Sequence, residues 1–129
     1  MSANVNFGQN SRFKMGWIAL LVSAALMTLN HLGLIFFLHA PTLFAGFAAF
    51  NLYALLVILI PFRRGEKWAW YATWILPIGL AAPAFIAGNG NIAIFYYVAA
   101  AVCVLGLLLT MRAFFSHEQS LARRSGSAT

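Results

Sequence analysis

The chain has 129 residues, of which 63% are hydrophobic and only 8% charged, and its net charge is +6. Soluble domains carry about 25% charged residues, so this composition excludes a water-soluble globular domain and predicts that most of the chain lies in lipid. A single cysteine, Cys103, excludes an intramolecular disulfide, a paired-thiol redox motif and a cysteine cluster for zinc or iron–sulfur.

Four apolar stretches predict an all-α, integral membrane four-helix bundle. After a polar arm at residues 1–14, the first stretch is longer than the 7–15-residue core of a cleavable signal peptide, so it is interpreted as an uncleaved span. With a rise of 1.5 Å per residue, each stretch is about long enough to cross a ~30 Å hydrocarbon core. The predicted spans are 15–38, 43–60, 68–86 and 92–115, and residues 116–129 are expected to form a flexible tail.

The positions of the basic residues predict the orientation of these spans. All eight Lys and Arg lie in the arm, in the loop 63–67 or between residues 112 and 124, whereas the turns at 39–42 and 88–91 hold none. The positive-inside rule then places both termini in the cytoplasm of a multi-pass inner-membrane protein. In the same loop, Glu66 is expected to cap the third span, where a carboxylate meets the positive end of the helix dipole.

The basic loop itself has two interpretations. Arg63, Arg64 and Lys67 are candidates for contact with an anionic lipid headgroup or an acidic partner, each contributing about 1 kcal/mol near an anionic leaflet. The alternative, which is preferred because every multi-span protein needs such a loop, is that they only set the topology. Nucleic acid is not an expected partner.

The absence of acidic residues from all four predicted spans disfavours several classes of membrane protein. A proton-coupled exporter of small cations needs a carboxylate in the membrane, and a membrane isomerase that uses acid–base chemistry would usually need one too. The Cys-x-x-Cys motif of a thiol oxidase is also missing.

Uncharged polar residues form the candidate site. Asn30 and His31 are expected ~20 Å from the cytoplasmic boundary and Asn51 ~18 Å from it, with Tyr97 near the same level. These four residues predict a ligand-binding pocket in the outer half of the bundle, next to a third span broken by its prolines. The preferred alternative is that Asn and His only form packing hydrogen bonds between helices. No cofactor or metal site is expected, because haem ligation by His31 would need another helix or a second protomer.

One stretch resembles a known family. Residues 63–71 read Arg-Arg-Gly-Glu-Lys-Trp-Ala-Trp-Tyr, which is similar to the central loop of small uncharacterised bacterial four-span proteins, some of them grouped with DoxX-like membrane proteins. The resemblance covers this loop and the four-span layout. It implies a bacterial inner-membrane helical bundle and assigns no functional residues.

The leading functional hypothesis is a small inner-membrane protein that acts as a non-catalytic accessory or structural subunit. It would self-associate or pack on a larger membrane complex, with membrane lipids as its other contacts. One alternative is a carrier or enzyme for an apolar molecule, such as an isoprenoid, quinone or hydrocarbon, bound in the outer-half pocket. A further alternative is a small-solute transporter without proton coupling.

Overall fold

The structure, a computed structural model, describes residues 11–37, 41–88 and 90–126, together with their side chains except those of residue 87 and residues 116–126. Every element in this part of the chain is helical. In order these are α1 (Ser11–Phe37), α2 (Pro41–Val57), the π-helical turn η2 (Ile58–Phe62), α3 (Lys67–Thr73), α4 (Ile75–Ala87) and α5 (Asn91–Gly126).

Four stretches are long and apolar enough to cross a membrane, which confirms the predicted all-helical, four-span architecture. Their large apolar side chains stay exposed on the outside, as expected where the solvent is lipid. The first begins four residues earlier than predicted, and α5 continues beyond the fourth. Residues 1–10 of the predicted arm and residues 39–40 of the predicted turn lie outside the described residues, whereas residues 11–14 belong to α1 and residues 41–42 to α2. The flexibility of the tail stays a prediction. The four candidate spans are Ser11–Phe37, Pro41–Phe62, Lys67–Ile86 and Asn91–Phe115.

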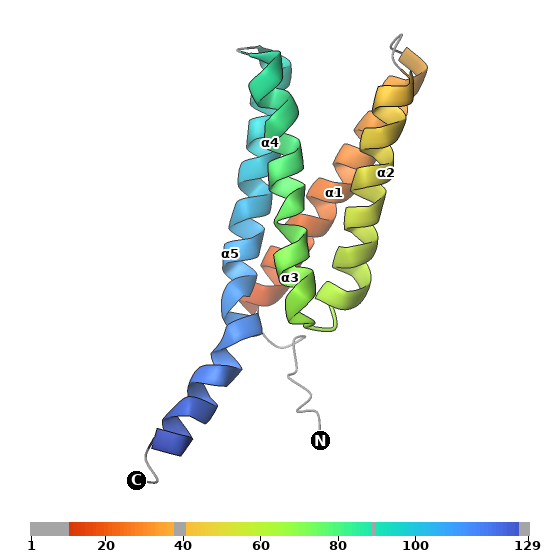
Figure 1. The fold of residues 1–129 in the computed structure, drawn as a ribbon. Helices are drawn as coiled ribbons and strands as arrows, with labels where there is room; N and C mark the ends of the chain where they lie inside the picture. The colour runs from red at the N-terminus through yellow and green to blue at the C-terminus, as the bar shows by residue number, and fades with distance from the viewer. Residues whose placement is uncertain (1–10, 38–40, 89, 127–129) are drawn as a thin grey trace.

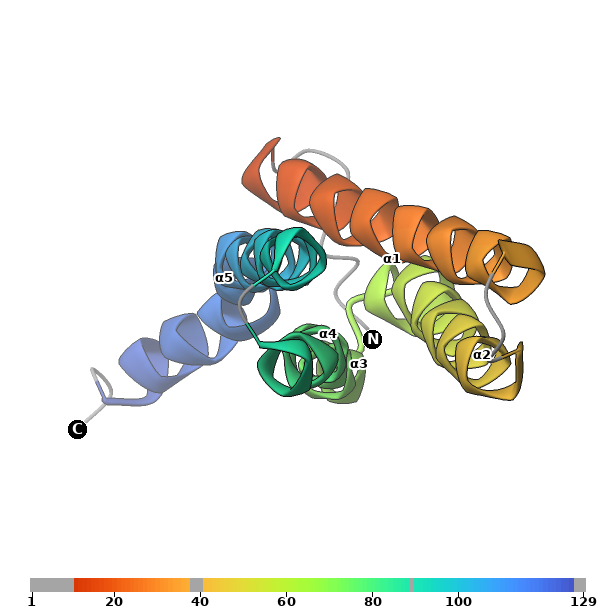
Figure 2. The same cartoon turned by 90° about the horizontal axis from the view of Figure 1, so that it is seen from above.

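The helices form an arc rather than a closed ring. Helix α1 packs against both α2 and α5, and α4 packs against α5. Seen from above, α2 and α4 therefore face each other across the opening of the arc (Figure 2). Figure 1 shows that α2 approaches α3 at one end of the bundle and diverges from α4 toward the other.

A pair of glycines brings α1 and α5 into direct backbone contact. A Cβ atom built on Gly16 would lie 2.6 Å from the carbonyl oxygen of Gly106, and one built on Gly106 would lie 2.9 Å from the carbonyl oxygen of Gly16. Small residues permit this approach in a membrane, where packing and not hydrophobic burial holds helices together. The two glycines therefore fix where α1 crosses α5.

Three phenylalanines gather the start of α1, η2 and the fourth span at one end of the bundle. The ring of Phe62 lies 6.2 Å from that of Phe13 and 4.9 Å from that of Phe114, and all three side chains are buried. The loop after η2 holds Arg63 and Arg64, so we call this the basic end (Figure 1). The opposite end, where α4 finishes and α5 begins, is the far end.

The π-helical turn occurs where Pro61 prevents regular α-helical hydrogen bonding, because proline has no N–H to donate. The indole N–H of Trp17 donates to the carbonyl oxygen of Ile58 in this turn at 3.0 Å. The guanidinium of Arg63 lies over the Trp17 ring, 5.7 Å from its centroid. Trp17 therefore links α1 to the end of the second span.

The third span is broken at Trp74, between α3 and α4. Pro77 cannot donate to the carbonyl of Thr73, which is the interruption expected from the sequence; helix α4 nevertheless continues through Pro83. The short α3 is held on α5 by Trp70, whose indole N–H donates to the carbonyl oxygen of Leu107 at 3.1 Å. This contact fixes the third span at the basic end.

Candidate functional site

Three buried polar side chains from three different helices meet in the far half of the bundle. His31 of α1 lies at the centre, with its Nε2 2.7 Å from the hydroxyl oxygen of Tyr96 on α5. Its Nδ1 lies 3.1 Å from Nδ2 of Asn51 on α2. His31 and Asn51 are each only 1% exposed. We call these three residues the polar trio.

The backbone next to Asn51 fixes which way the Asn51 amide faces. Nδ2 of Asn51 donates to the carbonyl oxygen of Phe47 at 2.8 Å, and a carbonyl can only accept, so the orientation of the amide is settled. The second hydrogen on Nδ2 faces Nδ1 of His31. In the tautomer in which Nδ1 accepts this hydrogen, Nε2 of His31 carries the ring proton and donates to the hydroxyl of Tyr96.

One polar atom of the polar trio makes no hydrogen bond within the described part of the chain. Oδ1 of Asn51 is buried and has no hydrogen-bond partner among the residues that the structure describes. An unsatisfied buried acceptor costs about 1–3 kcal/mol, and such atoms are rare enough in folded proteins to need an explanation. The amide is held on its nitrogen side, so Oδ1 cannot escape this cost by rotation.

The four predicted site residues do not all come together. His31 and Asn51 meet as expected, but Asn30 is only half-buried and lines a separate cavity of about 320 Å³ between α1, α2 and α5. Tyr97 is 44% exposed and lines another cavity beside the turn that precedes α5. The phenol that bonds His31 is that of Tyr96. Tyr96 and Tyr97 lie at the same level, but neighbouring residues point about 100° apart around a helix, and the level along the helix does not choose between them.

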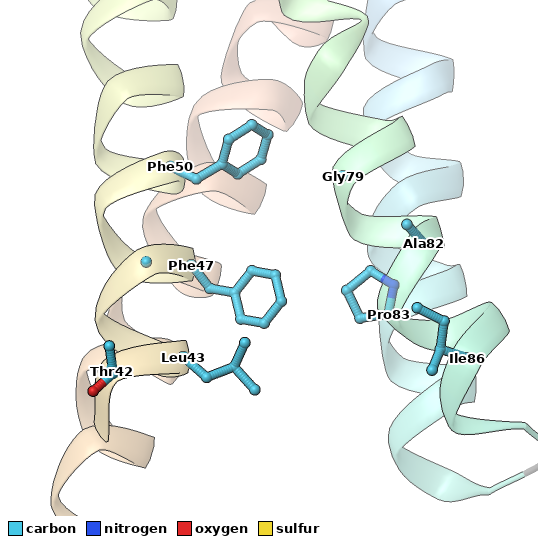
Figure 3. Close-up of a pocket in the computed structure, with 9 residues that line it drawn as sticks. Thr42, Leu43, Phe47, Phe50, Gly79, Ala82, Pro83 and Ile86 are labelled. Atoms are coloured by element: carbon cyan, nitrogen blue, oxygen red, sulfur yellow. The ribbon is translucent and has the colours of Figure 1, made fainter. Parts of the chain in front are cut away.

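An apolar cleft of about 810 Å³ lies between α2 and α4. Figure 3 shows that the side chains of Leu43, Phe47 and Phe50 reach from α2 across it toward α4. We call it the α2–α4 cleft. It is lined by Thr42, Leu43, Gly46, Phe47, Phe50, Gly79, Ala82, Pro83 and Ile86.

The cleft occupies the far half of the bundle and is closed at mid-depth. The ring of Phe50 lies directly on Gly79, where an added Cβ would be 2.8 Å from two of the ring carbons. A smaller cavity of about 190 Å³, which shares Phe50 as a wall, lies beyond this contact. From Thr42 to Phe50 the cleft runs ~12 Å along α2, which is less than half of a ~30 Å hydrocarbon core.

Phe47 connects the cleft to the polar trio. Its side chain lines the cleft, its ring stacks on that of His31 with centroids 5.3 Å apart, and its carbonyl accepts the hydrogen bond from Asn51. The cleft wall is thus backed by the only described polar cluster that joins three helices. Gly46 on α2 and Gly79 and Ala82 on α4 are small residues of the kind that lets membrane helices pack closely, yet here the two helix faces that carry them stand apart.

The candidate basic contacts lie at the other end of the molecule. Arg63 covers Trp17, and the ammonium of Lys67 lies 6.0 Å from the ring centroid of Phe115. Arg64 is exposed beside a shallow hollow that it shares with Glu66. None of the three basic residues lines the α2–α4 cleft. They therefore cannot bind the charged group of a molecule held there.

Glu66 occupies the N-cap position of α3, as predicted, but does not cap the helix with its side chain. Its carboxylate instead accepts a hydrogen bond from the indole N–H of Trp68. The tryptophan two residues later competes for the carboxylate, which the charge pattern alone did not indicate.

No family model, curated protein or solved structure matches the chain.

Proposed function

We propose that this multi-pass membrane protein holds a lipid-like apolar molecule in the α2–α4 cleft. The observation that carries the proposal is the cleft itself, because its volume of about 810 Å³ falls within the roughly 300–1,000 Å³ typical of ligand pockets. Thr42 is the only residue of its lining with a polar side chain. An isoprenoid, a quinone or quinol, or a hydrocarbon has the apolar body that such walls favour.

The depth of the cleft favours a lipid-like molecule over a helix of a partner protein. A partner's membrane-spanning helix crosses both leaflets, and the contact between Phe50 and Gly79 blocks its path halfway. A molecule that belongs to one leaflet needs only ~12 Å of cleft and enters sideways from the bilayer. Shape thus supports the carrier hypothesis over the accessory-subunit hypothesis for this surface.

The lining supports binding or carrying rather than catalysis. General acid–base chemistry needs a titratable group within hydrogen-bond reach of the reacting atom. The nine lining residues include no acid, histidine, lysine or tyrosine, and His31 stands behind Phe47. We therefore propose a binding protein and not an enzyme.

We further infer that the basic end faces the cytoplasm of a bacterium and that the membrane is the inner one. Support comes from the basic residues at 12–14, 63–67 and 112, which belong to segments that meet at one end of the bundle, and from the resemblance of the 63–71 loop to DoxX-like proteins. On this orientation the cleft opens into the outer leaflet. Anionic lipid at Arg63, Arg64 and Lys67 then belongs to the inner leaflet and stays a separate proposal.

The accessory-subunit hypothesis remains the second candidate. Gly33 on α1 faces open space, with nothing within 4 Å of an added Cβ, and such small-residue positions suit close helix contact. The transporter alternative has less support, because the contact between Phe50 and Gly79 closes the cleft before it crosses the bundle.

Mass spectrometry of the purified full chain tests these proposals. An added Cβ on Gly46 or on Gly33 meets nothing within 4 Å, but only Gly46 lines the cleft, so Gly46→Trp fills it and Gly33→Trp is the matched control. The expected result is an apolar small molecule that co-purifies with the wild type and with Gly33→Trp and is lost from Gly46→Trp. Retention by Gly46→Trp contradicts the proposal. A ligand-free oligomer instead favours the accessory subunit.

A further inference from the structure

We propose that the molecule held in the α2–α4 cleft ends in an uncharged hydroxyl-bearing group, one hydroxyl of which donates a hydrogen bond to Oδ1 of Asn51. This inference rests on the proposed function of the cleft and adds the chemistry of the ligand's polar end. It identifies an apolar alcohol or a quinol as the ligand class, and excludes a quinone, a hydrocarbon and a phospholipid.

The first step is that Oδ1 of Asn51 is an oriented acceptor. The carbonyl of Phe47 and the ring of His31 take both hydrogens of the amide nitrogen, and Tyr96 holds that ring in place from α5. Oδ1 itself has no partner in the part of the chain that the structure describes. Contacts from three helices thus fix the orientation of one unpaired hydrogen-bond acceptor.

The second step is the link between this oxygen and the cleft, which runs through Phe47, because Asn51 itself does not line the cleft. Phe47 lies one turn before Asn51 on α2, lines the cleft and accepts the hydrogen bond from Asn51 through its carbonyl. The ring of Phe47 stands between the cleft and the ring of His31, on which it stacks. The inference therefore includes a movement of Phe47: its ring turns aside when the ligand binds, and the ligand's end group takes the place of the ring beside the polar trio.

The third step is the charge of the end group. A carbonyl oxygen accepts hydrogen bonds, so the ligand must donate one; a quinone has only acceptors and a hydrocarbon has neither. A phosphate end group would need a cation, and the sequence has no Lys or Arg from residue 15 to 62 or from 68 to 111. Burial of an unpaired charge there is strongly unfavourable. A neutral hydroxyl is the group that fits.

The test compares two probes that differ in one hydrogen-bond donor: the isoprenoid alcohol geranylgeraniol and its methyl ether. Binding of each to the full chain in nanodiscs is measured by saturation with radiolabelled probe. The expected result is that the wild type binds the alcohol about tenfold more tightly than the ether, because only the alcohol satisfies Oδ1. Asn51→Ser should remove this preference and leave the affinity for the ether unchanged. Asn30→Ser, the matched control outside the polar trio, should keep it.

Equal affinity of the wild type for alcohol and ether overturns the inference, as does a preference that survives Asn51→Ser. If Asn51→Ser does not fold, the comparison of the two probes on the wild type still decides. Failure of the proposed function looks different: neither probe then binds saturably, or Gly46→Trp binds both as well as the wild type does. If both probes bind saturably and with equal affinity, only the inference about the ligand's hydroxyl group fails, and the proposed function stands.

Discussion

The contact between Gly16 and Gly106 makes a quantitative prediction about stability. An alanine at position 16 would place its Cβ 2.6 Å from the carbonyl oxygen of Gly106, 0.8 Å short of the 3.4 Å at which ordinary contact begins. Backbone lies on both sides of this contact, so no side chain can turn away, and α1 and α5 must separate. Such overpacking costs about 1–3 kcal/mol. We expect Gly16→Ala to lower the free energy of unfolding by that amount relative to its control.

The control is Gly33→Ala, because Gly33 lies on the same helix with nothing within 4 Å of its added Cβ. Both substitutions gain the same ~1 kcal/mol of helix propensity, so the difference between the two variants isolates the clash. Unfolding by sodium dodecyl sulfate in mixed micelles, followed by circular dichroism, measures that difference. If the two variants are equally stable, the backbones of α1 and α5 are not in contact and the packing described above is wrong.

Three further predictions concern other contacts. Trp17→Phe removes the indole donor to the π-helical turn and should destabilise the protein by about 0.5–1.5 kcal/mol in the same assay. Tyr96→Phe should cost about 1–3 kcal/mol by leaving the buried histidine without its partner, whereas Tyr97→Phe, at an exposed position, should cost little. A membrane-impermeant maleimide applied to intact cells should label Gly90→Cys and not Arg64→Cys; the reverse pattern would place the basic end outside.

The sequence was sufficient to predict the architecture because lipid leaves few alternatives. A chain with 8% charged residues and four long apolar stretches must satisfy its backbone hydrogen bonds within helices. The break in the third span was also predictable, since Pro77 removes a specific hydrogen bond. The π-helical turn at Pro61 was not predictable, because a proline can equally end a helix, and the second span was predicted to end at residue 60.

The polar trio was predictable in part, and the limit is geometric. The rise of a helix gives the depth of a residue to within a turn, which was enough to bring His31 and Asn51 to one level. Which way each side chain points depends on how each helix is rotated about its axis, and packing against its neighbours sets that rotation. Tyr96 and Tyr97 have the same chemistry at the same depth, so the sequence could not distinguish the buried phenol from the exposed one.

The α2–α4 cleft follows from where α1 crosses α5. The glycine contact pins these helices near the basic end, and from there α1 tilts away from α5 toward the far end (Figure 1). Helix α2 packs along α1 and follows its tilt, whereas α4 packs along α5. Helices α2 and α4 therefore diverge on the far-end side of the contact between Phe50 and Gly79, where the cleft begins. No residue pattern within α2 or α4 encodes the gap, because its cause lies in the other two helices. Gly16→Ala, which shifts this crossing, should thus alter ligand retention as well as stability, although position 16 does not line the cleft.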